Sequence, residues 1–247
     1  MQVEAATLEL SSTTIVYQLK RSRRRRRTIE VSIDATSGLS VAAPMRTPQH
    51  EIDAFLRRKQ EWIVLRLEGA RNGTQREERS YRSGESVPYL GEQLTLRVVD
   101  AGEAARTSAR LAGGCLEVRL TSGRGEDERR AAIAQGLERW YRARARVAFS
   151  QRVRLFSRLV GAEPRRVIAK AQKTRWGSCG KDGTLRFNWC LVMAPLPLVD
   201  YIVVHELCHL RRPGHGKAFW RLVAKVLPDF ESRRAELRRS GWQYRFP

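Results

Sequence analysis

The stretch LVDYIVVHELCHL, residues 198–210, decides how the second half of the chain folds. Prolines at 195 and 197 precede it and Pro213-Gly214 closes it, as expected at helix ends. The sequence therefore predicts a buried helix over these residues. The apolar positions recur at the three- and four-residue spacing of one buried stripe: Val199, Ile202, Val203, Leu207 and Leu210.

The same stretch contains the pattern HExxH, formed by His205, Glu206 and His209. On a helix, residues i and i+4 lie on one face about one turn apart, so two imidazoles at this spacing can hold one zinc ion. Glu206 would reach a water molecule beside the metal rather than the metal itself, which suits a general base. We therefore predict a catalytic metal site with Glu206 as its base.

A catalytic zinc site takes a third protein ligand and keeps one position open for water. Three of the chain's four histidines lie within residues 205–215, and the last of them follows a turn that can fold the chain back toward the metal. We predict His205, His209 and His215 as the metal ligands. The alternative third ligands are Cys208, Asp229, Glu231 and Glu236.

Two cysteines near the predicted metal site are expected to be structural. Cys208 points about 100° away from the preferred helix face, and we expect it in the core. Cys179 ends the segment TRWGSC, residues 174–179, in which Trp-Gly indicates a tight turn with a buried anchor at Trp176. A cysteine nucleophile would need a histidine to activate it, and only His50 remains, far away in sequence.

Arg175 and Asn188 are the predicted substrate-binding residues. Both lie in the segment that precedes the HExxH helix. Arg175 could bind substrate or a developing oxyanion, and Asn188 could do the same. The alternative for both side chains is a structural hydrogen bond.

The chain changes character at TSGRGED, residues 121–127, a polar stretch with two glycines. Before it, strand composition recurs between Ser, Gly and Pro residues, and one helix is expected at 48–67. We therefore predict an N-terminal α+β region over 1–125 and a second domain over 126–247. The expected strands in the first region are 13–19, 27–34, 39–44, 87–91, 93–100 and 115–120.

The second region is predicted to be mainly helical. Apolar spacing predicts a helix over 126–160, ended by Gly161 and Pro164. Residues 166–172 and 184–192 have the pattern of paired strands around the turn at 180–183. Two further helices are expected after the HExxH helix, near 217–227 and 229–239.

The composition fits a folded protein, with 42% hydrophobic and 30% charged residues in 247. The net charge of +21 comes from 47 Lys+Arg against 26 Asp+Glu. Clustered on one face, this charge would attract nucleic acid; dispersed, it reflects a preference for arginine over a solvated surface. We favour the dispersed arrangement and expect at most weak electrostatic binding of nucleic acid.

We expect a cytoplasmic protein that does not cross a membrane. The start, MQVEAATLEL, lacks the basic-then-apolar order of a secretory signal. The longest apolar run, residues 190–210, is interrupted by two prolines and by charged residues. The four cysteines form no CxxC pair and no disulfide framework, so a reducing compartment is expected. The pattern indicates no particular oligomeric state.

Three segments resemble the YgjP-like metallopeptidase family of predicted zinc-dependent hydrolases. They are TRWGSCGKDGTLRFNWCLVMAP, DYIVVHELCHL and GHGKAFW, at 174–195, 200–210 and 214–220. The N-terminal segments RSRRRRRTIEVSID and SGESVPYLGEQLTLRV also resemble it, so the likeness spans roughly residues 13–243. More distantly, the C-terminal motifs resemble those of the SprT and WLM zinc proteases.

The resemblance implies an α+β fold, with a small β-rich N-terminal region that has one helix. Behind it would lie a zincin-like catalytic domain whose helices pack on a short antiparallel sheet. The resemblance implies that His205, His209 and His215 are the metal ligands and that Glu206 is the base. Both assignments agree with the spacing of these residues. Cys208 stands where the family's pattern often has a small residue such as alanine, a departure that leaves the ligand set intact.

The leading functional hypothesis is a zinc-dependent hydrolase, specifically a metallopeptidase acting on peptides or proteins. Zinc would polarise the scissile carbonyl and lower the pKa of its bound water toward about 7. Glu206 would take the proton from that water and pass it to the leaving amine.

Three alternative functions stay open at this point. A nucleic-acid-associated protein would present a continuous basic face, but no zinc-finger or RNA-recognition signature supports it. A structural zinc site would need a fourth protein ligand, and none lies at a suitable spacing. A nucleotide phosphohydrolase or pyrophosphatase would use the same metal site with arginines on the phosphate: Arg175, Arg186, Arg211 and Arg212.

Overall fold

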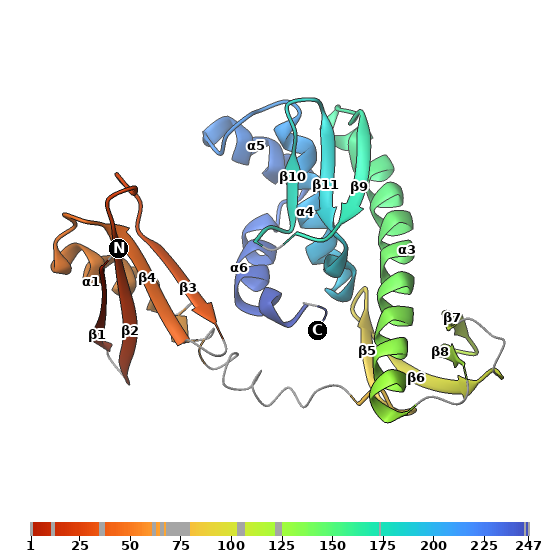
Figure 1. Cartoon of the computed structure of the whole chain (residues 1–247). Coiled ribbons are helices and arrows are strands. Elements are labelled where there is room, and N and C mark those ends of the chain that lie inside the picture. Colours follow the sequence, from red (N-terminus) through yellow and green to blue (C-terminus); the bar gives the residue numbers. More distant parts are fainter. Residues whose placement is uncertain are drawn as a thin grey trace. The chain divides into compact units, whose positions relative to one another are not determined.

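The computed structural model of the chain divides into two compact units, Met1–Arg79 and Ser80–Pro247. Figure 1 shows the elements of each unit, and the two units are described separately. The structure describes residues 2–10, 13–34, 38–60, 63–64, 67, 80–102, 107–121, 125–172, 174–244 and 246.

Unit 1 contains a four-stranded sheet of order β1-β2-β4-β3 and the helix α1. β2 and β4 run parallel, and the other neighbours are antiparallel. In β2, Ile15, Tyr17 and Leu19 are buried whereas Val16 and Gln18 are exposed, so one face of the sheet forms a core with α1. The elements are β1 (Gln2–Leu10), β2 (Thr13–Ser22), β3 (Glu30–Asp34), β4 (Gly38–Pro44) and α1 (Gln49–Arg58).

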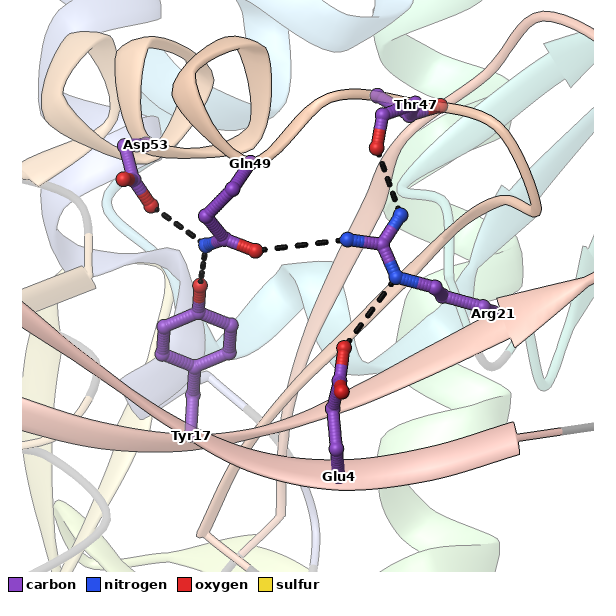
Figure 2. Close-up of polar contacts among 6 residues, drawn as sticks. All are labelled: Glu4, Tyr17, Arg21, Thr47, Gln49 and Asp53. Atoms are coloured by element: carbon purple, nitrogen blue, oxygen red, sulfur yellow. Dashed lines mark hydrogen bonds and ion pairs between the residues drawn. The ribbon is translucent and has the colours of Figure 1, made fainter.

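A polar network joins the start of α1 to β2 (Figure 2). The Gln49 side-chain amide donates to the Tyr17 hydroxyl at 2.7 Å and to Oδ1 of Asp53 at 2.8 Å. The Arg21 guanidinium donates to the carbonyl oxygen of Thr47 at 2.6 Å. These contacts orient α1 on the sheet. The helix expected at 48–67 is thus confirmed over Gln49–Arg58, while Trp62 and Leu65 of that prediction lie outside the described residues.

Unit 2 begins with a second four-stranded sheet of order β5-β6-β8-β7. Leu96 of β6 and Val118 of β8 belong to one core with Ile133 and Leu137 of the long helix α3. The expected boundary at 125/126 therefore lies inside unit 2, because α3 buries its apolar stripe on these strands. The elements are β5 (Ser86–Tyr89), β6 (Glu92–Asp100), β7 (Ser108–Ala112), β8 (Cys115–Leu120) and α3 (Glu126–Val160).

The helix α3 runs along the whole of unit 2 (Figure 1). Three acidic residues in its first turn, at 126–128, favour its start, and Gly161 ends it with a left-handed φ of 70°. Near its C-terminal end, the Arg152 guanidinium donates to both carboxylate oxygens of Asp200, at 2.6 and 2.8 Å. This bidentate pair joins α3 to the helix that carries HExxH.

The third sheet confirms that the strands expected at 166–172 and 184–192 pair with each other, but the pairing is parallel and the turn leads from a third strand. The turn at 180–183 joins β10 to β11, and β9 pairs with β11 in parallel. The sheet is therefore mixed rather than antiparallel, because β10 forms the hairpin with β11 and β9 pairs with the other edge of β11. The residues that follow β11 form a 3-10 helix rather than more strand. The elements are β9 (Arg166–Lys170), β10 (Gly177–Cys179), β11 (Thr184–Asn188) and η1 (Trp189–Met193).

The C-terminal helices match their expected positions and complete an α+β fold. α4 lies in the core of unit 2, and ten of its residues are buried. Among the described residues, no helix is long and apolar enough to span a membrane. The elements are α4 (Leu196–His209), α5 (Lys217–Val226), α6 (Phe230–Ser240) and η2 (Gly241–Gln243).

Candidate metal centre

Three histidine rings converge at the C-terminal end of α4. Nε2 of His205 lies 3.2 Å from Nε2 of His209 and 3.0 Å from Nε2 of His215. α4 sets the first two residues at i and i+4 on one face. The third returns through a loop in which Gly214 adopts a φ of 83°, a value that glycine adopts without strain. The structure thus brings together the three histidines that the spacing selected.

Burial favours the neutral form of His205 and His209. The pKa of His205 is lowered to about 3, first by burial and then by the neighbouring His209 and His215. Burial also lowers the pKa of His209. Nδ1 of His209 lies 3.3 Å from the carbonyl oxygen of Arg212, so we assign the proton to Nδ1 and the free lone pair to Nε2. Nδ1 of His205 is buried without a hydrogen-bond partner among the described residues.

This donor set fits a zinc ion. Zinc–nitrogen bonds of about 2.0–2.1 Å at tetrahedral angles place ligand nitrogens roughly 3.3 Å apart, near the observed separations. Imidazole lone pairs that face one another at this range repel unless a proton or a cation lies between them. No fourth Asp, Glu, His or Cys joins the group within the described part of the chain. Three ligands and an open position are typical of catalytic rather than structural zinc sites.

Two aromatic residues of α5 pack against the histidine rings. Phe219 is buried and stacks on His209, with ring centroids 4.5 Å apart. Trp220 stacks on His215, with centroids 5.7 Å apart. The pattern H-x-x-x-F-W therefore places one aromatic ring against each of two histidines. Such packing restricts the imidazoles to the orientation in which their Nε2 atoms converge.

Glu206 is buried beside the three histidines, with 5% of its surface exposed. Burial raises the pKa of its carboxyl to about 7, while Arg175 and a hydrogen bond from the Cys179 backbone act in the opposite direction. A carboxyl group with this pKa exists in both protonation states near neutral pH. It can therefore accept a proton and return it, as a general base and acid must.

Gly177 of β10 lies directly against the Glu206 side chain. A Cβ atom on Gly177 would lie 2.7 Å from both Cγ and Oε1 of Glu206. The position therefore needs glycine, and the reason is side-chain packing rather than backbone conformation. The sequence pattern does not single out Gly177 as a site residue, although the Trp-Gly pair at the start of a short strand is a signal for it.

The edge of β10 that does not pair with β11 faces Glu206. Gly180 N donates to Thr184 O and Asn188 N donates to Trp176 O, so these backbone groups face β11. In an antiparallel pair the alternate residues then direct their backbone groups to the opposite edge. This accounts for the hydrogen bond between the Cys179 backbone and Glu206.

The family model described as "YgjP-like, metallopeptidase domain" matches residues 27–240 of this chain. The chain belongs to the YgjP-like family. Membership supports a metal-dependent peptidase and agrees with the resemblance seen in the motifs.

No curated protein matches this YgjP-like chain. Among solved structures, it is similar to the crystal structure of the metallopeptidase zymogen of Pyrococcus abyssi abylysin, at 21% identity with a TM-score of 0.34. That similarity covers 36% of this chain and 90% of the other.

Trp176 and Cys179 are half-buried and pack against the core of unit 2. The indole of Trp176 packs against the C-terminal segment, where a Cβ on Gly241 would lie 3.3 Å from its Nε1. This contact joins the residue before β10 to η2. Burial raises the pKa of the Cys179 thiol, as do Glu206 and Asp182, which disfavours the nucleophilic thiolate.

The observed contacts of Asn188 are hydrogen bonds within the fold. Its amide nitrogen donates to Gln172 O at 2.8 Å, and its amide oxygen accepts from Cys190 N at 3.1 Å, which caps η1. Both polar ends are therefore engaged. Arg175 is exposed and acts electrostatically on Glu206. Roles in substrate binding stay predictions for these two residues.

The alternative third ligands lie outside the histidine group. Cys208 is fully buried, and burial raises the pKa of its thiol to about 12. Asp229 accepts a hydrogen bond from Arg233 at 2.8 Å. The buried position of Cys208 agrees with the core role predicted from the helix geometry.

Proposed function

We propose that this chain is a zinc-dependent peptidase in which His205, His209 and His215 hold the metal and Glu206 is the base. The observation that carries the proposal is the convergence of three histidine Nε2 atoms, all within 4.8 Å, beside a buried carboxyl on the same helix. Bound there, zinc would supply Lewis acidity toward a substrate carbonyl and a water molecule.

Glu206 would move the proton during hydrolysis. Its carboxylate would accept a proton from the attacking water, and the resulting acid would donate it to the leaving amine. A pKa raised to about 7 suits both transfers near neutral pH. Gly177 and the Cys179 backbone would position the carboxylate, since they contact it from β10.

A polypeptide substrate is favoured by the strand beside Glu206. β10 has one neighbour, β11, in its sheet, so its other edge is not paired with a strand among the described residues. An extended peptide can add to such an edge through main-chain hydrogen bonds. The family match points the same way.

The phosphohydrolase alternative has less support. Arg186 lies 3.7 Å from the Asp182 carboxylate and donates to Thr184 O. Arg211 donates to Val160 O at 3.0 Å, which joins the end of α4 to α3. Two of the four arginines that would bind phosphate therefore have partners within the fold.

The substitution Glu206→Gln tests the proposed base. The variant should bind zinc in the same ratio as the wild type by elemental analysis, but should lose hydrolysis of labelled casein or peptides. Glu231→Gln, at an exposed position of α6, is the matched control and should stay fully active. Hydrolysis retained by Glu206→Gln would refute the assignment, and release of phosphate from nucleotides by the wild type would favour the alternative.

A further inference from the structure

A pocket of about 760 Å³ adjoins the candidate metal centre on the outer side of α5. We call it the α5 pocket. His215 forms one end of it, so the pocket begins where the histidine group ends. Gly216, Trp220, Ala224 and Phe230 continue its lining. The α5 pocket is an open depression on the surface rather than an enclosed cavity.

The floor of the α5 pocket is a fixed aromatic surface. The Trp220 indole stacks on the Phe230 ring with centroids 5.3 Å apart and an interplanar angle of 15°. The Arg234 guanidinium lies 4.6 Å from the centroid of the same indole. Contacts with His215 and Phe219 hold the ring further. An apolar group that enters the pocket thus meets a rigid surface and loses water without requiring the floor to rearrange.

Two basic side chains line the same pocket. Lys217 and Arg221 are exposed and lie at i and i+4 on α5, so they share one helix face. Neither has an acidic partner among the described residues, whereas the nearby Arg233 pairs with Asp229. The pocket therefore combines an apolar floor with unneutralised positive charge.

We propose that the α5 pocket binds an apolar side chain of a polypeptide substrate in which the adjacent residues are acidic. The proposal rests on the proposed function, which makes the bound molecule a peptide. The apolar side chain would cover Trp220 and Phe230, and the flanking carboxylates would face Lys217 and Arg221. Charge complementarity across these contacts favours acidic sequences and disfavours basic ones.

The position of the pocket favours a peptide over a nucleic acid. The pocket starts at His215, so a chain held at the metal centre would reach it within a few residues. Two cations one helical turn apart can also contact successive phosphates of a nucleic acid. Competition by nucleic acid is therefore an outcome that the experiment must include.

The experiment measures peptide binding by fluorescence anisotropy, separately from cleavage. The protein is the full chain with Glu206→Gln, loaded with zinc. The probes are fluorescein-labelled seven-residue peptides with amidated C-termini and a central phenylalanine flanked by glutamate, glutamine or lysine. The glutamate peptide should bind about tenfold more tightly than the glutamine peptide, and the lysine peptide should bind least. Equal affinities for the three peptides would overturn the proposal.

Two variants locate the binding on the α5 pocket. Lys217→Glu with Arg221→Glu should weaken binding of the glutamate peptide about tenfold or more and improve that of the lysine peptide. The control, Arg154→Glu with Arg158→Glu, reverses two exposed charges at the same spacing on α3 and should change affinity less than about twofold. Circular dichroism checks that both variants fold. Equal changes of affinity in the two double variants would show that only the net charge of the protein matters, and would refute binding at the α5 pocket.

Filling the pocket tests its apolar floor. Ala224→Phe should weaken binding of the phenylalanine peptide and leave a peptide with a central glycine unchanged. Unchanged binding of the phenylalanine peptide would contradict the proposal, as would displacement of the peptide by a short oligonucleotide at a lower concentration than by unlabelled peptide.

The cleavage assay on the wild-type chain separates the two proposals. Selective binding without hydrolysis would refute the peptidase function while the pocket stands. If the rate of hydrolysis depends neither on the flanking charges of the peptide nor on the Lys217 and Arg221 substitutions, substrate binding at the α5 pocket is refuted while the peptidase function stands.

Discussion

Replacement of Gly177 by alanine should disable the candidate site without removing its metal ligands. The added Cβ would lie 2.7 Å from Cγ and Oε1 of Glu206 and 3.0 Å from its Cδ. Ordinary contact begins at 3.4 Å, so the difference from 2.7 Å requires a displacement of about 0.7 Å. Because Glu206 is buried on the core helix α4, the carboxylate must leave its present position.

We expect Gly177→Ala to lower the catalytic rate more than it lowers the stability of the fold. A displacement approaching 1 Å of a catalytic group lowers the rate about 100-fold. Overpacking costs roughly 1–3 kcal/mol, which lowers the Tm of a domain of this size by several degrees. Zinc affinity should change less than about twofold, because the three histidines lie on other elements.

The assay compares kcat/KM on a labelled peptide, zinc affinity against a competing chelator, and Tm. Gly125→Ala is the control, because nothing lies within 4 Å of a Cβ at that position. Glu206→Asp shortens the side chain and relieves the contact, so Gly177→Ala should cost less in that background than in the wild type. Wild-type kcat/KM in Gly177→Ala would refute the positioning role, and so would the same cost in both backgrounds.

Three further predictions concern the metal site and the fold. His205→Ala should lose stoichiometric zinc by elemental analysis and abolish peptide hydrolysis, whereas His50→Ala on α1 should retain both. Removal of zinc by chelation should lower Tm, since an ion at about 100 times its Kd stabilises the folded state by about 2.7 kcal/mol. Arg152→Ala should destabilise unit 2 by about 3 kcal/mol in urea unfolding, because it leaves Asp200 buried without its bidentate partner. Zinc retained by His205→Ala, an unchanged Tm after chelation, or a cost below about 1 kcal/mol for Arg152→Ala would contradict the respective prediction.

The helices of unit 2 were predictable because their apolar residues repeat at helical spacing. Expected helices at 126–160, 198–210, 217–227 and 229–239 agree closely with α3, α4, α5 and α6. Local signals also mark their ends, such as Gly161 after α3. Such patterns depend on neighbours three or four residues apart, so they need no knowledge of the tertiary structure.

The strands were less predictable because pairing depends on distant residues. β1 and β7 were not expected, since the alternation of apolar residues in VEAATLEL and SARLA is weak. The sequence predicted that β9 pairs with β11, but the parallel direction of that pair and the presence of β10 between them in sequence required the complete sheet. The two compact units divide at 79/80, whereas the domain boundary predicted from the sequence is at 125/126.

The amino-acid sequence by itself determined the histidine group, because two ligands lie one helical turn apart and the third follows a glycine turn. It also led to the proposal of Glu206 as the base, through adjacency on the same helix. Only the tertiary structure decided what surrounds that carboxyl: the Cα of Gly177, the Cys179 backbone and the burial that raises the pKa. It likewise assembled the α5 pocket, whose aromatic floor comes from α5 and α6. Ligand spacing is a local property of a helix, whereas close contacts and desolvation arise when separate elements pack together.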